Sequence, residues 1–98
     1  MIRENIGFVG LGRMGSRMAL RLVGYFSVFG TDKAASLRRL AESNGVTWVD
    51  DAMLLASKCR YVFIVAGSEN DVTEIIFGER GLVRGIASKT TIIVCATV

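Results

Sequence analysis

The sequence predicts one α/β domain in which helices cover both faces of a parallel sheet. Two observations lead to this fold class. Short apolar runs alternate along all 98 residues with segments whose apolar residues recur at the helical period. A glycine motif, G-x-G-x-x-G, lies between the first apolar run and the first helical segment. A doubly wound parallel sheet, the Rossmann fold, accounts for both observations.

The glycine motif follows the apolar run at residues 6–9. Gly10 allows a sharp turn, Gly12 leaves room for a pyrophosphate, and Gly15 lets the helix pack closely on the strand. The phosphates would meet free N–H groups and the positive end of the helix dipole. The residues expected at this end of the ligand are Gly10, Leu11, Gly12, Arg13, Met14 and Gly15.

Asp32 ends the second apolar run, residues 26–31, and follows Gly12 at the distance expected of an acid that binds ribose hydroxyls. Its carboxylate would repel a 2′-phosphate, whereas Lys33 beside it could bind one. The segment Thr31-Asp32-Lys33 therefore favours NAD slightly over NADP. Alternatively, Asp32 caps the next helix, and the two roles can coexist.

The rest of the chain continues the alternation of helix and strand. Gly24 and Gly45 are placed as helix stops. The apolar run at 61–66 is typical of a central parallel strand buried on both faces. The expected elements are a first helix carrying Met14 to Leu22, helices at 33–44, from Asp51 and at 69–77, and strands at 46–49, 61–66 and 90–96. Because the chain ends on a strand without a covering helix, we expect a fragment of a longer protein.

The string G-F-V-G-L-G-R-M-G-S-R-M-A at residues 7–19 resembles the opening of the β-hydroxyacid dehydrogenases. This family includes 3-hydroxyisobutyrate dehydrogenase and 6-phosphogluconate dehydrogenase. The resemblance implies that residues 1–98 are the N-terminal dinucleotide-binding domain. It also implies that the full-length parent transfers hydride between NAD or NADP and a small 3-hydroxy acid or semialdehyde, and that the C-terminal helical domain for substrate binding and dimerisation is absent.

Two loops depart from the family pattern. Relatives commonly read M-L-P-D or M-L-S-D after the fourth strand, where this chain has Val-Ala-Gly-Ser at 65–68. They read D-x-S-T-V/I after the last strand, where Ala96 replaces the serine of the substrate motif and Thr97 matches. The resemblance implies that Ala66, Gly67 and Thr97 contact the nicotinamide side of the cofactor. The departures leave open an alternative, a non-catalytic nucleotide-binding module.

No catalytic residue is assigned within the chain. The family's catalytic lysine, a general acid/base, lies beyond residue 98, and none of Lys33, Lys58 or Lys89 stands at a matching position. The chain alone is therefore expected to be inactive. A different nucleotide ligand, S-adenosylmethionine or FAD, fits the glycine motif less well.

Composition excludes several other classes of function. The chain has no histidine and two cysteines 36 positions apart, so neither a zinc site nor a Cys-His pair is expected. The net charge of +3 is modest, and the arginines at 13, 17 and 21 are interpreted as a solvated helix face rather than a nucleic-acid surface. No apolar run approaches membrane-spanning length. We expect a soluble protein of the cytoplasm or an organelle matrix, either a monomer or a weak dimer through a sheet edge.

Overall fold

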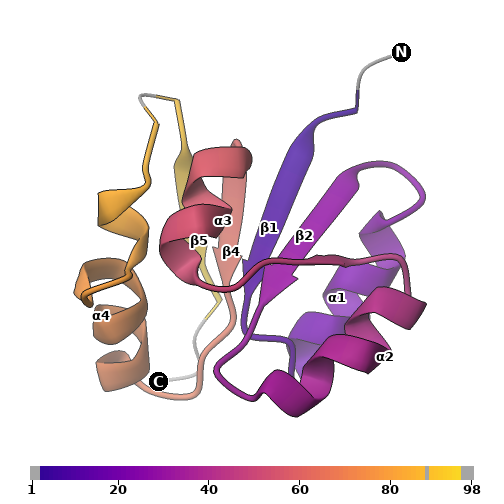
Figure 1. Cartoon of the computed structure of the whole chain (residues 1–98), viewed down its shortest axis with the longest axis horizontal. Coiled ribbons are helices and arrows are strands. Elements are labelled where there is room, and N and C mark those ends of the chain that lie inside the picture. Colours follow the sequence, from indigo (N-terminus) through magenta and orange to yellow (C-terminus); the bar gives the residue numbers. More distant parts are fainter. Residues whose placement is uncertain (1–2, 88, 96–98) are drawn as a thin grey trace.

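The computed structural model describes residues 3–87 and 89–95 (Figure 1). Within them, five parallel strands form one sheet in the order β3-β2-β1-β4-β5. The strands are β1 (Asn5–Val9), β2 (Ser27–Thr31), β3 (Thr47–Trp48), β4 (Tyr61–Ile64) and β5 (Thr91–Val94). The helices are α1 (Arg13–Leu22), α2 (Arg38–Ser43), α3 (Ala52–Lys58) and α4 (Glu69–Phe77), with single 3-10 turns η1 (Ala35–Leu37) and η2 (Leu82–Arg84). The doubly wound sheet is as predicted.

The core lies on both faces of β1, because successive side chains of a strand point to opposite faces. Figure 1 shows α3 in front of the sheet and α1 behind it. Ile6 and Phe8 belong to the cluster of buried residues under α1 and α2, whereas Val9 packs with Leu55 of α3. Phe8 is fully buried and stacks on Phe63 of β4, with ring centroids 5.0 Å apart. The two clusters hold β1 at the centre of the domain.

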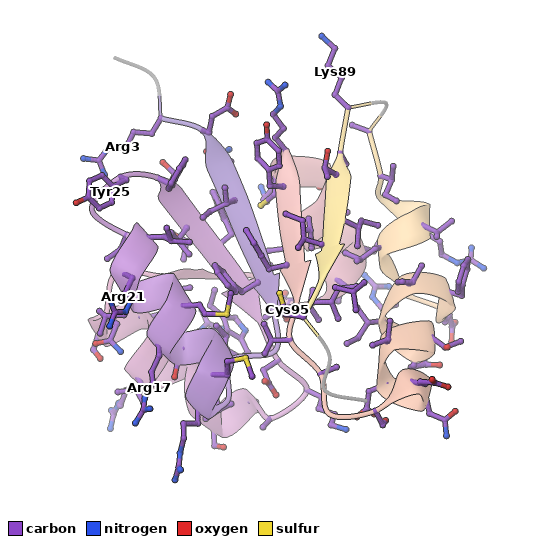
Figure 2. The ribbon with its side chains drawn as sticks, turned by 180° about the vertical axis from the view of Figure 1, so that it is seen from behind. Arg3, Arg17, Arg21, Tyr25, Lys89 and Cys95 are labelled. Carbon is purple, nitrogen blue, oxygen red and sulfur yellow. The ribbon has the colours of Figure 1, made fainter. Side chains whose placement is uncertain are left out.

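The burial of β4 differs from the prediction. Val62 and Ile64 are fully buried on the α3 face, but Tyr61 and Phe63 on the other face are only partly buried. Helices α1 and α2 lie over β1, β2 and β3, so they leave this face of β4 and β5 less covered (Figure 2). The expectation of burial on both faces was therefore correct for one face alone.

Several predicted boundaries also shift. The helix expected at 33–44 begins as the η1 turn at Ala35 and continues as α2, and Gly45 follows it with φ +90°. The strand expected at 46–49 contains only two paired residues. The strand expected at 90–96 runs from Thr91 to Val94, and its predicted end at Ala96 lies outside the described residues. Among the described helices none is long and apolar enough to cross a membrane.

Candidate functional site

A groove of about 360 Å³ opens at the carboxyl ends of β1 and β4. The strand order reverses there: from β1 the chain proceeds to β2 and β3 on one side, then returns to β4 on the other. Ligands of open α/β sheets bind at such a switch point. Six of the predicted site residues line the groove: Gly10, Gly12, Asp32, Lys33, Ala66 and Gly67.

The three glycines of the motif have different surroundings. Gly10 has φ +104°, and a Cβ added there would collide with the carbonyl of Val65. A Cβ on Gly15 would collide with the Gly10 carbonyl. By contrast, a Cβ on Gly12 would meet nothing within 4 Å, because Gly12 borders the open groove. The first two glycines thus allow close backbone packing, while Gly12 leaves space for a ligand.

Helix α1 begins at this glycine turn. Gly12 is its N-cap without a side-chain cap, and its first turn contains no acidic residue. Arg13 and Met14 in its first turn are exposed residues, although neither is among those that line the groove. The positive end of the helix dipole is therefore left available for an anion. This arrangement fits the pyrophosphate of a dinucleotide.

Asp32, directly after β2, stabilises the glycine turn that follows β1. Its Oδ2 accepts a hydrogen bond of 2.7 Å from the amide of Leu11, and its Oδ1 accepts one of 2.8 Å from the amide of Ala34. The second bond forms an Asx turn ahead of η1. Asp32 is not a helix cap, because η1 has Ala34 as its N-cap and no side-chain cap. The alternative that Asp32 caps the next helix is therefore wrong.

Two other predicted residues, Leu11 and Thr31, do not line the groove. Leu11 is buried under α2, and its amide is already bonded to Asp32. Thr31 is 4% exposed, and its carbonyl accepts a 2.9 Å hydrogen bond from the Gly10 amide. Both residues therefore stabilise the glycine turn through these hydrogen bonds. Thr97 lies outside the described residues.

Sequence reasoning missed one wall of the groove. Asp71, Glu74 and Ile75 of α4 line it opposite the glycine turn. Lys33 Nζ lies 3.8 Å from Asp71 Oδ1, so an ion pair connects the end of β2 to α4. Ser68 is the N-cap of α4, and its Oγ accepts a 3.1 Å hydrogen bond from the Asp71 amide. The sequence signal that could have indicated this wall is the acidic first turn of the helix after the fourth strand, which contains Glu69 and Asp71.

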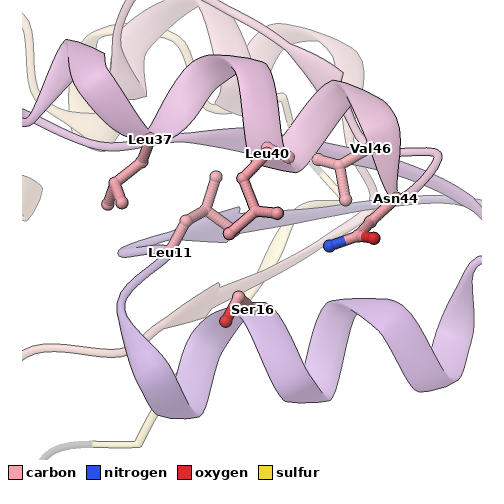
Figure 3. Close-up of a pocket in the computed structure, with 7 residues that line it drawn as sticks. Leu11, Ser16, Leu37, Leu40, Asn44 and Val46 are labelled. Carbon is pink, nitrogen blue, oxygen red and sulfur yellow. The ribbon is translucent and has the colours of Figure 1, made fainter.

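A second cavity, between α1 and α2, is too small for a cofactor (Figure 3). Its volume is about 10 Å³, and apolar side chains of Leu11, Leu37 and Leu40 point into it beside Ser16 and Asn44. Such a volume holds about one water molecule at most. We interpret it as a packing gap in the core.

Neither Cys59 nor Cys95 is among the residues that line this groove. Burial raises the pKa of the Cys59 thiol to about 12, and nearby Lys58 only partly offsets this effect. A thiol that remains protonated at neutral pH is a poor nucleophile. Within residues 3–87 and 89–95, no group of three or more acidic, cysteine or histidine side chains could hold a metal ion.

Comparison with known proteins agrees with this geometry. Residues 5–98 match the family model described as the NAD binding domain of 6-phosphogluconate dehydrogenase. The chain belongs to this family. It is thus an NAD(P)-binding domain of the hydroxyacid dehydrogenase type, and the predicted resemblance to the β-hydroxyacid dehydrogenases is confirmed.

Individual relatives are similar over the whole of this domain. L-threonate dehydrogenase from Escherichia coli O6:H1 (strain CFT073) is 28% identical over 96 residues, covering 96% of this chain and 32% of the relative. The structure of 3-hydroxyisobutyrate dehydrogenase from Mycobacterium tuberculosis with L-serine superposes with a TM-score of 0.86 at 26% identity, covering 99% of this chain and 32% of that one. Psf3 in complex with NADP+ and 2-OPP has the same fold, with a TM-score of 0.86 at 23% identity over 95% of this chain and 34% of that one. The chain thus spans about a third of the length of these proteins.

Proposed function

We propose that this domain binds a nicotinamide dinucleotide, with a preference for NAD, in a protein that transfers hydride to or from a small 3-hydroxy acid or its semialdehyde. The observation that carries the proposal is the groove at the switch point. It is open at Gly12, adjoins the N-terminus of α1, and has the Asp32 carboxylate at its β2 side. These are the three features that a dinucleotide requires of this fold.

Each part of the groove has a different task in this proposal. The first-turn amides of Arg13 and Met14 and the α1 dipole bind the pyrophosphate. Asp32 faces the adenosine ribose, where its negative charge opposes a 2′-phosphate and favours NAD. Ala66 and Gly67 after β4 border the nicotinamide side, where the small alanine and the absence of a side chain at Gly67 leave room for the ring. The cofactor, when bound, accepts or donates the hydride.

Substrate chemistry is proposed to require a further part of the protein. The relatives extend over about three times the length of this chain, and the described residues offer the groove no histidine and only one lysine, Lys33. Lys33 lies at the adenosine side, far along the ligand from a reacting carbon. We therefore assign residues 1–98 the dinucleotide-binding role and place the general acid/base in a separate helical domain.

A second candidate function is a nucleotide-binding module without catalysis. The sequence favours it at two places, because residues 65–68 read Val-Ala-Gly-Ser and Ala96 replaces a serine of the substrate motif. A missing hydroxyl removes a hydrogen bond that such a site would use to select its substrate.

Calorimetric titration of the chain with NADH and with NADPH tests the proposal. We expect both to bind, NADH more tightly, and we expect Gly12→Val to abolish binding of both while the far-ultraviolet circular dichroism stays unchanged. Absence of binding to the unaltered chain at millimolar cofactor would contradict the proposal. A hydride-transfer assay of a protein carrying this domain then separates the dehydrogenase from the non-catalytic module.

A further inference from the structure

We propose that Asp71 is a second determinant of cofactor preference, because it holds Lys33 away from the 2′ position of the adenosine ribose. This inference rests on the proposed function and adds a residue outside the glycine motif and the β2 end. It concerns the choice between two dinucleotides that differ by one phosphate group.

Lys33 is the only basic side chain that lines the described groove. It follows Asp32 directly, so it lies beside the carboxylate that faces the ribose. A 2′-phosphate would carry two negative charges to this place, where an ammonium group is its natural partner. Whether Lys33 is available therefore affects NADP far more than NAD.

Asp71 competes with a phosphate for Lys33. It belongs to α4, on the opposite wall of the groove, and its Oδ1 lies 3.8 Å from Lys33 Nζ. The pair therefore draws the lysine toward α4, away from the backbone of Asp32. Lys33 must leave Asp71 before it can bind a phosphate at the ribose, and this loss opposes NADP binding.

Asp32 cannot make this selection by hydrogen bonding alone. Both of its oxygens already accept hydrogen bonds from backbone amides, those of Leu11 and Ala34. Its discrimination against a phosphate thus depends mainly on charge, which Lys33 beside it partly cancels. Because Asp71 pairs with Lys33, it reduces this cancellation and so restores the discrimination against a 2′-phosphate.

The expected effect is modest because the pair is exposed. The side chains of Lys33 and Asp71 are 90% and 47% exposed, and water screens their attraction. Exposed ion pairs of this kind change an equilibrium by roughly two- to fivefold. Asp71 therefore adjusts the cofactor preference rather than creating it.

The test is a double-mutant cycle with NAD+ and NADP+ as ligands, measured by calorimetric titration. Asp71→Asn should lower the ratio of the NADP+ to the NAD+ dissociation constant by roughly two- to fivefold. In the Lys33→Ala background, the same substitution should leave that ratio unchanged. Glu74→Gln is the matched control, because Glu74 lines the same groove and loses the same charge. It should alter the two dissociation constants by the same factor.

Three results would overturn the inference while leaving the proposed function intact. The ratio could be unchanged in Asp71→Asn, it could change equally in Glu74→Gln, or it could change equally without Lys33. If neither cofactor binds the unaltered chain, the proposed function fails and this inference fails with it. The thermal midpoint of each variant shows whether it is folded, and the Ser68 cap of α4 bonds the backbone of Asp71, which the substitution retains.

Discussion

The amide of Leu11 donates a 2.7 Å hydrogen bond to Oδ2 of Asp32, 21 positions further along the chain. This bond connects the glycine turn after β1 to the end of β2. The Asp32 carboxylate also accepts from Ala34, so it fixes the first residues after β2. One side chain therefore shapes both parts of the groove that would border the adenosine ribose. Its ligand role and its structural role have to be separated by experiment.

We expect Asp32→Ala to lower both stability and NAD affinity. It leaves the amides of Leu11 and Ala34 without their partner, which should cost about 1–3 kcal/mol of unfolding free energy. Asp32→Asn retains one acceptor oxygen, so it should cost less. Because it removes the charge that opposes a 2′-phosphate, Asp32→Asn should also improve NADP+ binding relative to NAD+. Urea unfolding and calorimetric titration measure the two effects.

Asp50→Asn serves as the charge-matched control for Asp32. Asp50 is exposed and does not line the groove, so its substitution should change neither quantity beyond about 0.5 kcal/mol. If Asp32→Ala unfolded at the same urea concentration as the unaltered chain, the two backbone hydrogen bonds would contribute nothing to stability.

Substitutions of the motif glycines should distinguish residues needed for ligand binding from residues needed for folding. Gly12→Ala places a methyl group in open space at an ordinary φ of −69°, so stability should change by less than about 1 kcal/mol. The same methyl group would occupy the expected position of the pyrophosphate and weaken cofactor binding by on the order of tenfold or more. Thermal unfolding and titration with NADH check this expectation.

Gly15→Ala provides the opposite case. Its Cβ would collide with the carbonyl of Gly10, so the helix must move from β1 and stability should fall by about 1–3 kcal/mol. The result that would contradict this assignment is a stable Gly15→Ala variant together with an unfolded Gly12→Ala variant.

The Asp51 carboxylate should make stability depend on pH in the acid range. Partial burial alone would raise its pKa, but hydrogen bonds from the Leu54 amide and from Arg80, together with the Arg80 charge, lower the pKa below its usual value. The folded state therefore binds this proton less readily than the unfolded chain. Its stabilising contribution is fully present above about pH 5 and is lost as the pH falls through the folded pKa.

Asp51→Asn isolates this charge, since asparagine is also a good N-cap for α3. The variant should be only slightly less stable at pH 7, because Arg80 is largely exposed and water screens its attraction to the carboxylate. The difference should shrink as the pH falls below about 4, as measured by urea unfolding at each pH. Arg80→Gln should remove most of the same pH dependence. A difference between Asp51→Asn and the unaltered chain that stayed constant down to pH 2 would contradict the assignment.

Much of this protein could be predicted from local sequence signals. The spacing of Gly10, Gly12 and Gly15 after an apolar run predicted the first strand, turn and helix, because these conformations depend on residues close together in the chain. Asp51 was likewise recognised as the start of α3. The alternation of short runs and helical periods predicted the parallel sheet. Family membership followed from the same local string and is confirmed.

Other features depended on contacts between distant segments. Whether Asp32 caps a helix or bonds the amide of Leu11 is decided by the pairing of β1 with β2, which brings residues 21 positions apart into contact. The acidic wall at Asp71 was missed because only the crossover to β4 places α4 opposite Lys33. The local sequence determined the elements and the glycine turn. The tertiary structure decided which charged groups meet across the groove, because those meetings depend on strand order and not on spacing along the chain.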